Sequence, residues 1–183
     1  MKIPQARIEI RCSNMLKGQI GLFALRNLRK GTIIAYGANL EEEFYPWSVY
    51  AKLDKQTRKM IDKYCASATD GFYGPKDINY LSLPWHMNHS CSGNVGFDEN
   101  DNFITLKYVR AGEELCYDYS LIVTNPIFKL RCKCGAKNCR KLISGNDWKD
   151  PEYRKKNFKN MSPTLKKLII SMMKNGRINR NDS

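Results

Sequence analysis

Short stretches of alternating apolar and polar residues, separated by glycine turns, run through the first part of the chain. Residues 7–11 (RIEIR) alternate strictly, which is the period of a half-buried strand. Residues 17–25 join a glycine turn to an apolar run, and residues 32–36 are rich in β-branched side chains. The same kind of pattern returns at residues 103–109 and 114–119. The chain therefore predicts a mainly β core made of short strands.

The pattern becomes helical after three consecutive glutamates at residues 41–43. Apolar side chains then recur at three- and four-residue steps over residues 50–64, which predicts one amphipathic helix with Pro46 in its first turn. Residues 69–75 combine glycine, proline and two aromatic residues and predict a turn-rich loop with exposed aromatics. We place a helical insertion at about residues 41–70 of the β core.

A second helix is predicted at about residues 163–175, near the end of the chain. Ser162 followed by Pro163 has the form of an N-cap and a first helical residue, and Asn175-Gly176 has the form of a helix end. Between them, one apolar stripe recurs at helical spacing: Leu165, Leu168, Ile169 and Met172. We expect this stripe to need a surface on which to dock, either in this domain or in a partner.

Length and composition favour a single main domain that works inside a cell. A chain of 183 residues is long enough to bury its own core. It has no run of about 18 apolar residues, and its start lacks the apolar segment of a signal peptide, so we expect no membrane association and no secretion. Seven cysteines, an odd number, fit a reducing compartment with metal-bound thiols better than a disulfide framework.

Positive charge is concentrated in the last third of the chain. The formal net charge is +13, and residues 126–183 hold 16 Lys and Arg against 4 Asp and Glu. A basic surface of this kind attracts nucleic acid or anionic lipid head groups. The alternative is a solvated basic tail that only keeps the protein soluble.

Three cysteines lie close together in a C-x-C-x₄-C pattern, at Cys132, Cys134 and Cys139. Thiolates at this spacing reach one metal ion at about 2.3 Å each without help from distant segments. Three ligands leave a tetrahedral Zn²⁺ open, so a structural site needs a fourth. The alternative is a redox-active or merely buried set of thiols.

The fourth ligand has four candidates elsewhere in the chain. Cys116 falls within a predicted strand, where a cysteine is commonly a small core residue. Cys12 and Cys65 have no local partner. Cys91 ends a polar loop and is followed by Ser-Gly-Asn, where the backbone is able to bend toward the later cysteines. We therefore predict one Cys₄ zinc site that fastens residues 132–139 to the loop at Cys91.

Three stretches together resemble the SET-domain protein-lysine methyltransferases that carry a cysteine-rich post-SET segment. They are Asn88-His89-Ser90-Cys91, then Gly112-Glu113-Glu114-Leu115 followed by Tyr117-Asp118-Tyr119, and then the three-cysteine pattern. The resemblance implies a SET domain at residues 6–120, a post-SET zinc segment at 128–145 and a basic C-terminal extension at 146–183. It also implies the fold of that family: mainly β with α insertions, small curved β-sheets and a pseudoknot in which the tyrosine strand passes under the Asn88-His89 loop.

The family uses S-adenosylmethionine, which leaves as S-adenosylhomocysteine, so the resemblance implies a site for this methyl donor. The implied binding residues are Gly18, Gly21, Leu22, Asn88, His89 and Leu142. Two features depart from the family pattern. The glycine turn reads G-x-x-G, one residue longer than the usual G-x-G, and Trp85-His86-Met87 replaces the common Arg-Phe-Ile. With only two histidines in the chain, we expect His89 to belong to the donor loop and His86 to be structural.

The resemblance also assigns the reacting residues. Tyr119 matches the family's final tyrosine and is implied to orient the lysine nitrogen for in-line methyl transfer. Tyr117 matches a position where family members carry phenylalanine or tyrosine and that tunes how many methyl groups fit. Because a tyrosine hydroxyl there takes up room, we expect mono- or dimethylation in preference to trimethylation. Ordinary strand aromatics are the alternative for both residues.

The substrate implied by the resemblance is a lysine-bearing protein, such as a histone or another basic protein. Acidic residues at 41–43 suit a basic peptide, although a solvated loop is the alternative. The basic C-terminal region suits contact with DNA, which favours nucleosomes as substrates. We expect the protein in the nucleus if its source is eukaryotic or if it acts on host chromatin, and otherwise in the cytoplasm. The competing hypothesis is a catalytically weak SET-fold adaptor that binds chromatin or nucleic acid.

Overall fold

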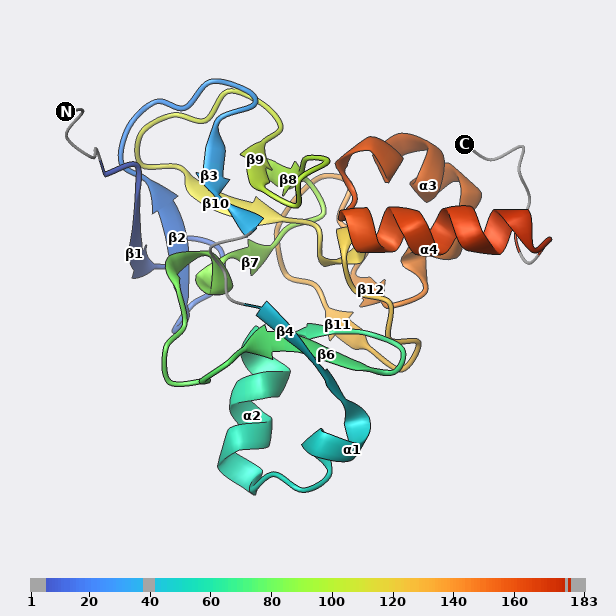
Figure 1. Ribbon diagram of the computed structural model, residues 1–183. Helices are drawn as coiled ribbons and strands as arrows, with labels where there is room; N and C mark the ends of the chain where they lie inside the picture. The colour runs from blue at the N-terminus through green and yellow to red at the C-terminus, as the bar shows by residue number, and fades with distance from the viewer. Residues whose placement is uncertain (1–5, 38–41, 177, 179–183) are drawn as a thin grey trace, which may run out of the picture.

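The computed structural model of the chain describes residues 6–37, 42–176 and 178 (Figure 1). Its largest sheet has the strand order β1-β2-β10-β8-β9-β3, with β7 paired to β10. These strands are short, as the apolar pattern predicts, and have these bounds: β1 (Ile8–Cys12), β2 (Ile20–Ala24), β3 (Ile33–Ala35), β7 (Asn88–His89), β8 (Val95–Phe97), β9 (Phe103–Thr105) and β10 (Glu114–Tyr117).

Strands β1 and β2 form an antiparallel pair in which Ile10 lies opposite Leu22. On its other edge β2 pairs with β10, where Leu22 lies opposite Leu115. Leu22 and Leu115 are fully buried in the core together with Val95 and Val109. The core therefore lies at the centre of the sheet, around β2, β8 and β10. The strand predicted at residues 114–119 ends at Tyr117, and Tyr119 begins a 3₁₀ helix.

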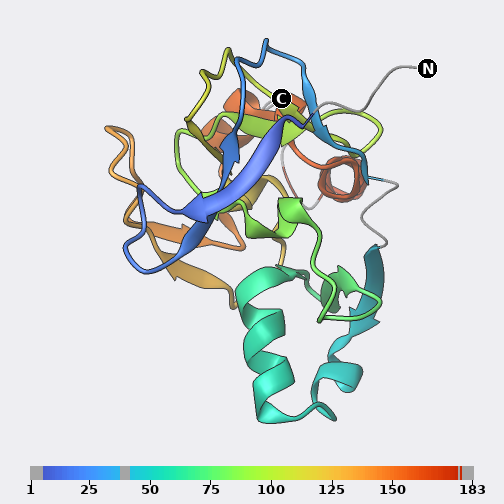
Figure 2. The same ribbon diagram turned by 90° about the vertical axis from the view of Figure 1, so that its left-hand side faces the viewer.

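The insertion forms a separate small sheet with two helices, below the main sheet in Figures 1 and 2. Its strand order is β4-β6-β5, and its elements are β4 (Glu42–Pro46), α1 (Trp47–Tyr50), α2 (Lys55–Tyr64), β5 (Ala66–Ser67) and β6 (Gly71–Pro75). The prediction of one helix over residues 50–64 is wrong, because the structure has two helices in this region and the second, α2, begins after Asp54. The Asp54 carboxylate accepts hydrogen bonds from the backbone N–H groups of Gln56 and Thr57 at 2.8 and 3.1 Å and caps α2.

The predicted loop at residues 69–75 is also wrong, because most of it is strand β6. Phe72 is only 4% exposed and stacks on Tyr45 of β4 with ring centroids 5.3 Å apart. Gly71 marks a close approach of the two strands, since a Cβ there would lie 2.1 Å from the carbonyl oxygen of Tyr45. The glycines thus allow tight strand pairing and do not mark turns.

A loop after β7 wraps around β10 and produces the pseudoknot. The N–H of Ser90 donates to the carbonyl oxygen of Tyr117, and the N–H of Asn94 donates to that of Cys116, both at 3.0 Å. The Asn94 side chain adds two buried bonds to β10, donating to the Glu114 carbonyl and accepting from the Cys116 N–H. The loop is therefore tied to β10 at both of its ends.

The C-terminal part packs on the core beside the sheet (Figure 1). It contains β11 (Lys129–Arg131), β12 (Leu142–Ser144), α3 (Pro151–Asn157) and α4 (Pro163–Lys174), with short 3₁₀ helices at Asp147–Lys149 and Phe158–Asn160. Other 3₁₀ helices lie earlier in the chain, at Leu83–His86 before β7 and at Tyr119–Leu121 after β10. The predicted C-terminal helix is confirmed as α4. The Ser162 hydroxyl accepts from the Leu165 N–H at 3.3 Å, and Leu165 and Ile169 are buried in the core, so the stripe docks within this domain. Over the residues that the structure describes, no helix has the length and apolar content to span a bilayer.

Candidate functional site

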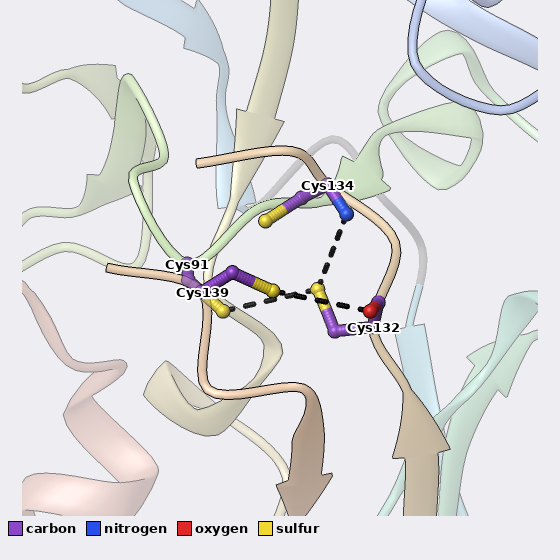
Figure 3. A group of neighbouring side chains, drawn as sticks. All are labelled: Cys91, Cys132, Cys134 and Cys139. Atoms are coloured by element: carbon purple, nitrogen blue, oxygen red, sulfur yellow. Dashed lines mark hydrogen bonds between the residues drawn. The ribbon is translucent and has the colours of Figure 1, made fainter. Parts of the chain in front are cut away.

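Four cysteines from two distant segments converge on one point. Their sulfur atoms all lie within 4.8 Å of one another, and Figure 3 shows the four side chains turned toward a common centre. Cys91 comes from the loop after β7, and Cys132, Cys134 and Cys139 come from the segment after β11. The predicted convergence of Cys91 with the three later thiols is therefore present.

The geometry of the four thiols fits a tetrahedral metal. With Zn–S bonds of about 2.3 Å, the sulfurs of a tetrahedral zinc site lie about 3.8 Å apart. The Sγ atoms of Cys91 and Cys132 are 3.8 Å apart. The backbone N–H groups of Arg140 and Cys134 contact the sulfurs of Cys91 and Cys132, both at 3.4 Å, and such contacts favour the thiolate form that binds metal.

Two short strands hold the base of the cysteine segment. Strands β11 and β12 pair with Arg131 opposite Leu142, and the N–H of Cys132 donates to the carbonyl oxygen of Lys141 at 2.8 Å. The segment is fastened to the Cys91 loop as well, because the Asn138 side-chain amide donates to the Cys91 carbonyl oxygen at 3.1 Å. The cysteines are thus placed by backbone pairing as well as by any shared metal.

The other cysteines lie away from this cluster. Cys116 is 6% exposed in β10, which confirms its expected place in the core, and Cys12 is exposed on β1. Cys65 follows α2 and lines a cavity described below. Burial raises the pKa of the Cys65 thiol to about 12, with Glu42 and Asp62 adding to the effect.

Asn88 lies three residues before Cys91 and is fixed by two hydrogen bonds of its side chain. Its amide nitrogen donates to the carbonyl oxygen of Ile20 and to Oε1 of Glu114, both at 2.9 Å. Asn88 is 8% exposed. It therefore joins the glycine turn, which precedes β2, to the start of β10.

Glu114 is a site residue that the sequence prediction missed. Its carboxylate accepts from the Ser13 hydroxyl at 2.8 and 3.0 Å and from the Asn14 N–H at 2.9 Å, in addition to Asn88. It thereby ties the turn that leads to β2 to the Asn88 loop. Its position within the Gly-Glu-Glu-Leu stretch was the available signal, but nothing local indicates that this glutamate points inward.

The two glycines of the turn differ in their surroundings. A Cβ at Gly21 would lie 2.3 Å from Oε1 of Glu114 and 3.0 Å from the Asn88 amide nitrogen, so no side chain fits there. Gly18 has φ of +79° with nothing within 4 Å of a Cβ, so its role is to let the turn adopt a left-handed backbone. Of the two residues between them, Gln19 precedes β2, whereas Ile20, like Gly21, already belongs to that strand.

Tyr119 is held by the Asn88–Cys91 segment and the residue before it. Its hydroxyl donates to the carbonyl oxygen of Met87 at 3.0 Å, and its backbone N–H donates to Nδ1 of His89 at 3.1 Å. Because Nδ1 accepts, the neutral His89 ring carries its proton on Nε2, which lies 3.4 Å from Sγ of Cys91. Burial lowers the pKa of His89 to about 4 despite the nearby Asp118 carboxylate, so the ring is neutral at pH 7.

Two cavities meet at Tyr119. One, of about 50 Å³, lies on the side of the glycine turn and is lined by Gln19, Ile20 and Asn88, among others. The other, of about 70 Å³, lies toward the insertion and has Tyr117 in its wall. The two cavities share five lining residues: Lys63, Tyr64, Trp85, Met87 and Tyr119.

Aromatic rings form much of the second cavity. Tyr117 packs on Tyr119 with ring centroids 4.9 Å apart and on Phe103 at 5.7 Å. Burial raises the pKa of Tyr117 and of Tyr119 above the ordinary tyrosine range, so both hydroxyls stay protonated at neutral pH. The arrangement gives a small cavity with aromatic rings and protonated tyrosines in its wall.

Arg140 is a second residue that the sequence prediction missed. It follows Cys139 directly, and its guanidinium donates to both carboxylate oxygens of Asp118, at 2.5 and 2.7 Å. It also donates to the Ser120 hydroxyl at 3.0 Å and lies 3.3 Å from a carboxylate oxygen of Asp147. The cysteine segment is thereby linked to both neighbours of Tyr119.

Leu22 and Leu142 do not line either cavity, whereas His86 does. The Leu22 side chain belongs to the hydrophobic core, so only its backbone is available to a ligand. Leu142 is 49% exposed at the edge of the cysteine segment. His86 contacts the Tyr64 ring at 5.3 Å and lines the cavity beside the glycine turn.

Comparison with known proteins agrees with this geometry. A model of the SET domain family matches residues 19–120. Human histone-lysine N-methyltransferase 2D is 41% identical over 66 residues, which is 32% of this chain and 1% of that protein. Histone-lysine N-methyltransferase Su(var)3-9 of Drosophila melanogaster is 30% identical over 96 residues, covering 42% of this chain and 15% of that protein.

A solved structure of a humanized mutant of the Chaetomium thermophilum Polycomb Repressive Complex 2, bound to an inhibitor, aligns over 64% of this chain and 15% of that one. Its TM-score is 0.47 at 20% sequence identity. The chain spans only a small part, 15% or less, of each of these relatives.

Proposed function

Because this chain belongs to the SET domain family, we propose that it is an S-adenosylmethionine-dependent protein-lysine N-methyltransferase. The observation that carries the proposal is the pair of cavities that share Tyr119 as a common wall. Methyl transfer needs a donor and an acceptor aligned from opposite sides of one point, within a site that excludes bulk water. The two cavities provide this arrangement without requiring a covalent intermediate on the protein.

The cavity beside the glycine turn is the proposed donor side. Bound there, S-adenosylmethionine supplies a methyl group on a sulfonium sulfur. Two features of the chain fit such a ligand: the missing side chain at Gly21, and buried ring nitrogens of Trp85 and His86 that lack a hydrogen-bond partner within the described part of the chain. In this proposal Asn88 and His89 fix the loop that faces the donor.

Other residues contribute to the donor site through their backbone or as a cover. We assign Gly18 to the turn that presents Gln19 and Ile20, since its left-handed φ of +79° favours glycine. Leu22 contributes backbone only. Leu142, half-exposed beside the cysteine segment, is the proposed cover for the adenine portion.

The aromatic cavity is the proposed acceptor side. The target lysine enters past Phe103 and Tyr117 and its nitrogen is oriented by Tyr119, whose hydroxyl is itself fixed by Met87. The Tyr117 hydroxyl takes space in the same channel. We therefore propose mono- or dimethylation in preference to trimethylation.

The four converged cysteines are the proposed site of one structural Zn²⁺. The 3.8 Å separation of two of the sulfurs and the N–H contacts to them fit this ion, and all four ligands come from the protein, as in structural sites. We assign the ion a role in closing the donor side, because Cys91 belongs to the same segment as Asn88 and His89.

We propose histones or other basic proteins as substrates and a chromatin-associated place of action. The curated relatives carry the name histone-lysine N-methyltransferase, which supports this choice. The net excess of basic residues in 126–183 supports an additional contact with DNA phosphates.

The decisive experiment is to incubate the purified chain with labelled S-adenosylmethionine and core histones, nucleosomes or a whole-cell extract, and to map any labelled lysine. We expect label on lysine and a loss of about 100-fold in kcat for Tyr119→Phe. Donor binding measured by calorimetry separates the competing adaptor hypothesis: no transfer to any lysine, together with tight binding to nucleosomes, supports an adaptor and overturns the enzyme.

A further inference from the structure

A carboxylate that the site described so far does not use lies in the acceptor cavity. Glu42, the first residue of β4, lines this cavity together with Tyr117 and Tyr119. It also lines a neighbouring, more open hollow of about 310 Å³ that includes Phe44 and Asp101. Glu42 therefore lies at the junction between the acceptor cavity and a path to solvent.

Strand geometry points the Glu42 side chain into this region. Successive side chains of a strand face opposite sides, so Glu42 and Phe44 share one face of β4, and Glu43 and Tyr45 share the other. Phe44 lines the open hollow with Glu42. The Glu43 carboxylate instead contacts the Tyr45 hydroxyl at 3.2 Å and lies 3.9 Å from the ammonium nitrogen of Lys76. Glu41 lies outside the described residues.

The other charged groups of the acceptor cavity are engaged. The Asp62 carboxylate accepts from the Tyr50 hydroxyl at 2.9 and 3.0 Å, and the Lys63 ammonium lies over the Tyr64 ring at 4.8 Å. Glu42 has no side-chain hydrogen bond or ion pair within the described residues. It is thus the carboxylate of this cavity that is available to a cation.

The reaction of the proposed function has a requirement that the tyrosines do not meet. A lysine in water is protonated at neutral pH, with a pKa of about 10.4, and its nitrogen must lose a proton before its lone pair attacks a methyl group. Both tyrosine hydroxyls are protonated, and their raised pKa values leave almost no tyrosinate at neutral pH to accept a proton.

We propose that Glu42 is a further catalytic residue, which pairs with the ammonium group of the target lysine and accepts its proton. This rests on the proposed function. The proton moves from the lysine nitrogen to a Glu42 carboxylate oxygen. The freed lone pair then forms the new N–C bond as the bond between the methyl carbon and the sulfonium sulfur breaks, leaving a neutral thioether and a methylated ammonium. Glu42 returns its proton to solvent through the open hollow.

The surroundings of Glu42 suit a carboxyl group that exchanges a proton near neutral pH. Burial raises the pKa of Glu42 to about 7, and the neighbouring Asp101 carboxylate adds to this effect. The titratable and charged groups that face Glu42 come from several elements: Asp101 before β9, Tyr73 of β6, Cys65 after α2, Tyr117 of β10, and Asp62 and Lys63 across the cavity. A lysine ammonium entering the channel favours the ionised form of Glu42, so the carboxylate is charged when it pairs with the ammonium.

The test compares pH profiles of methyl transfer to core histones for the wild type, Glu42→Gln and Glu43→Gln. We expect Glu42→Gln to lower kcat about 100-fold at pH 7. The ratio of wild-type kcat to variant kcat falls by about tenfold or more between pH 7 and pH 9.5, because a larger fraction of the free lysine is then already neutral. Glu43→Gln, which removes the same charge one residue along the strand, keeps the wild-type dependence of kcat on pH, and any contact of Glu43 with a basic substrate affects KM alone.

A second measurement needs no turnover. A carboxyl group whose pKa is about 7 in the folded protein and 4.5 in the unfolded chain favours the folded state most below pH 4.5 and loses that contribution as the pH rises through 7. Glu42→Gln therefore raises Tm relative to the wild type at pH 8 and much less at pH 5. Glu42→Asp keeps a carboxyl group and retains more kcat than Glu42→Gln, which checks the assignment if the glutamine variant folds poorly.

The outcomes separate this proposal from the proposed function. An active wild type with an unchanged pH profile in Glu42→Gln overturns the role of Glu42 and leaves the methyltransferase standing. A wild type that binds S-adenosylmethionine but transfers no methyl group overturns the proposed function, and the role of Glu42 with it. Equal Tm differences at pH 5 and pH 8 also count against a buried, titrating Glu42.

Discussion

Arg140 and Asp118 form a two-point ion pair that joins the cysteine segment to the residue before Tyr119, with N–O distances of 2.5 and 2.7 Å. Replacing Arg140 by alanine leaves the Asp118 carboxylate, whose side chain is 10% exposed, without its main partner. We expect Arg140→Ala to lower the free energy of unfolding by roughly 2 kcal/mol, below the range for fully buried pairs because the arginine side chain is 26% exposed. Chemical denaturation measures this change.

Two further variants give this prediction its controls. Arg140→Lys keeps the charge but lacks the planar fork of donors, so we expect an intermediate loss. Arg131→Ala removes an exposed arginine of β11 and should cost little. A loss in Arg140→Ala no greater than in Arg131→Ala contradicts a structural role for the ion pair.

Loss of the metal should weaken donor binding as well as stability. We expect Cys91→Ser to reduce bound zinc from about one ion per chain to a small fraction of that, since structural sites use four ligands. Because Cys91 shares a segment with Asn88 and His89, calorimetry should show weaker binding of S-adenosylmethionine. Cys12→Ser, an exposed thiol outside the cluster, should change the zinc content little. A Cys91→Ser variant that binds the donor normally breaks the link between the two sites.

A methyl group added at Gly21 should disturb the donor site from within. Its Cβ would overlap Oε1 of Glu114 and crowd the Asn88 amide, so both side chains must move. We expect Gly21→Ala to cost about 1–3 kcal/mol of stability and to weaken donor binding at least about tenfold. Gly31→Ala is the matched control: Gly31 has φ of +81° in open space, so alanine there strains the backbone but leaves donor affinity unchanged.

Tyr117 should control the number of methyl groups transferred. Removing its hydroxyl widens the channel next to Tyr119 and Phe103 without altering the ring contacts at 4.9 and 5.7 Å. We expect Tyr117→Phe to shift the products toward higher methylation, measured by mass spectrometry of the modified lysine. Tyr108→Phe, a change on a 53% exposed tyrosine, should leave the products unchanged. Mainly trimethyl-lysine from the wild type shows the inference to be wrong.

Added salt should lower methyl transfer to nucleosomes more than methyl transfer to free histones. If the basic residues of 126–183 contact DNA phosphates, each contact releases counterions, and affinity falls steeply as salt rises. We expect kcat/KM on nucleosomes to fall more than on isolated histones between 50 and 200 mM salt. Equal salt dependence of kcat/KM for the two substrates contradicts the proposed DNA contact.

Local patterns in the sequence predicted five strands of the main sheet (β1, β2, β3, β9 and β10), the C-terminal helix and the convergence of the cysteines, but not the other strands. The prediction was correct at Ser162, because a helix cap is adjacent in sequence to the helix that it caps. It was correct at Cys91, because a zinc site needs a fourth thiolate and only four other cysteines were available. Local patterns failed over residues 69–75, because glycine and proline signal a turn, whereas here Gly71 serves a close approach to Tyr45 that only the folded sheet reveals. The break before α2 was missed because the capping aspartate interrupts an otherwise continuous apolar repeat.

Contacts between distant residues account for most of the site that could not be predicted. Glu114 binds Ser13 across 101 positions, and Arg140 binds Asp118 across 22. No local period marks such pairs, since each partner on its own resembles an ordinary polar surface residue. The direction in which Glu42 points depends on the register of β4 against β6, where it lies opposite Pro75.

The tight passage at Gly93 affects how the protein unfolds. A Cβ there would lie 2.8 Å from the Tyr117 Cα and 2.9 Å from the Cys116 carbonyl oxygen. The loop therefore packs directly against the backbone of β10, with no room for a side chain. A metal at the four cysteines would also tie this loop to the segment after β11, so unfolding that separates the two segments must break a metal–sulfur bond. Zinc would then slow unfolding in addition to stabilising the native state, and so lengthen the time for which the native state survives.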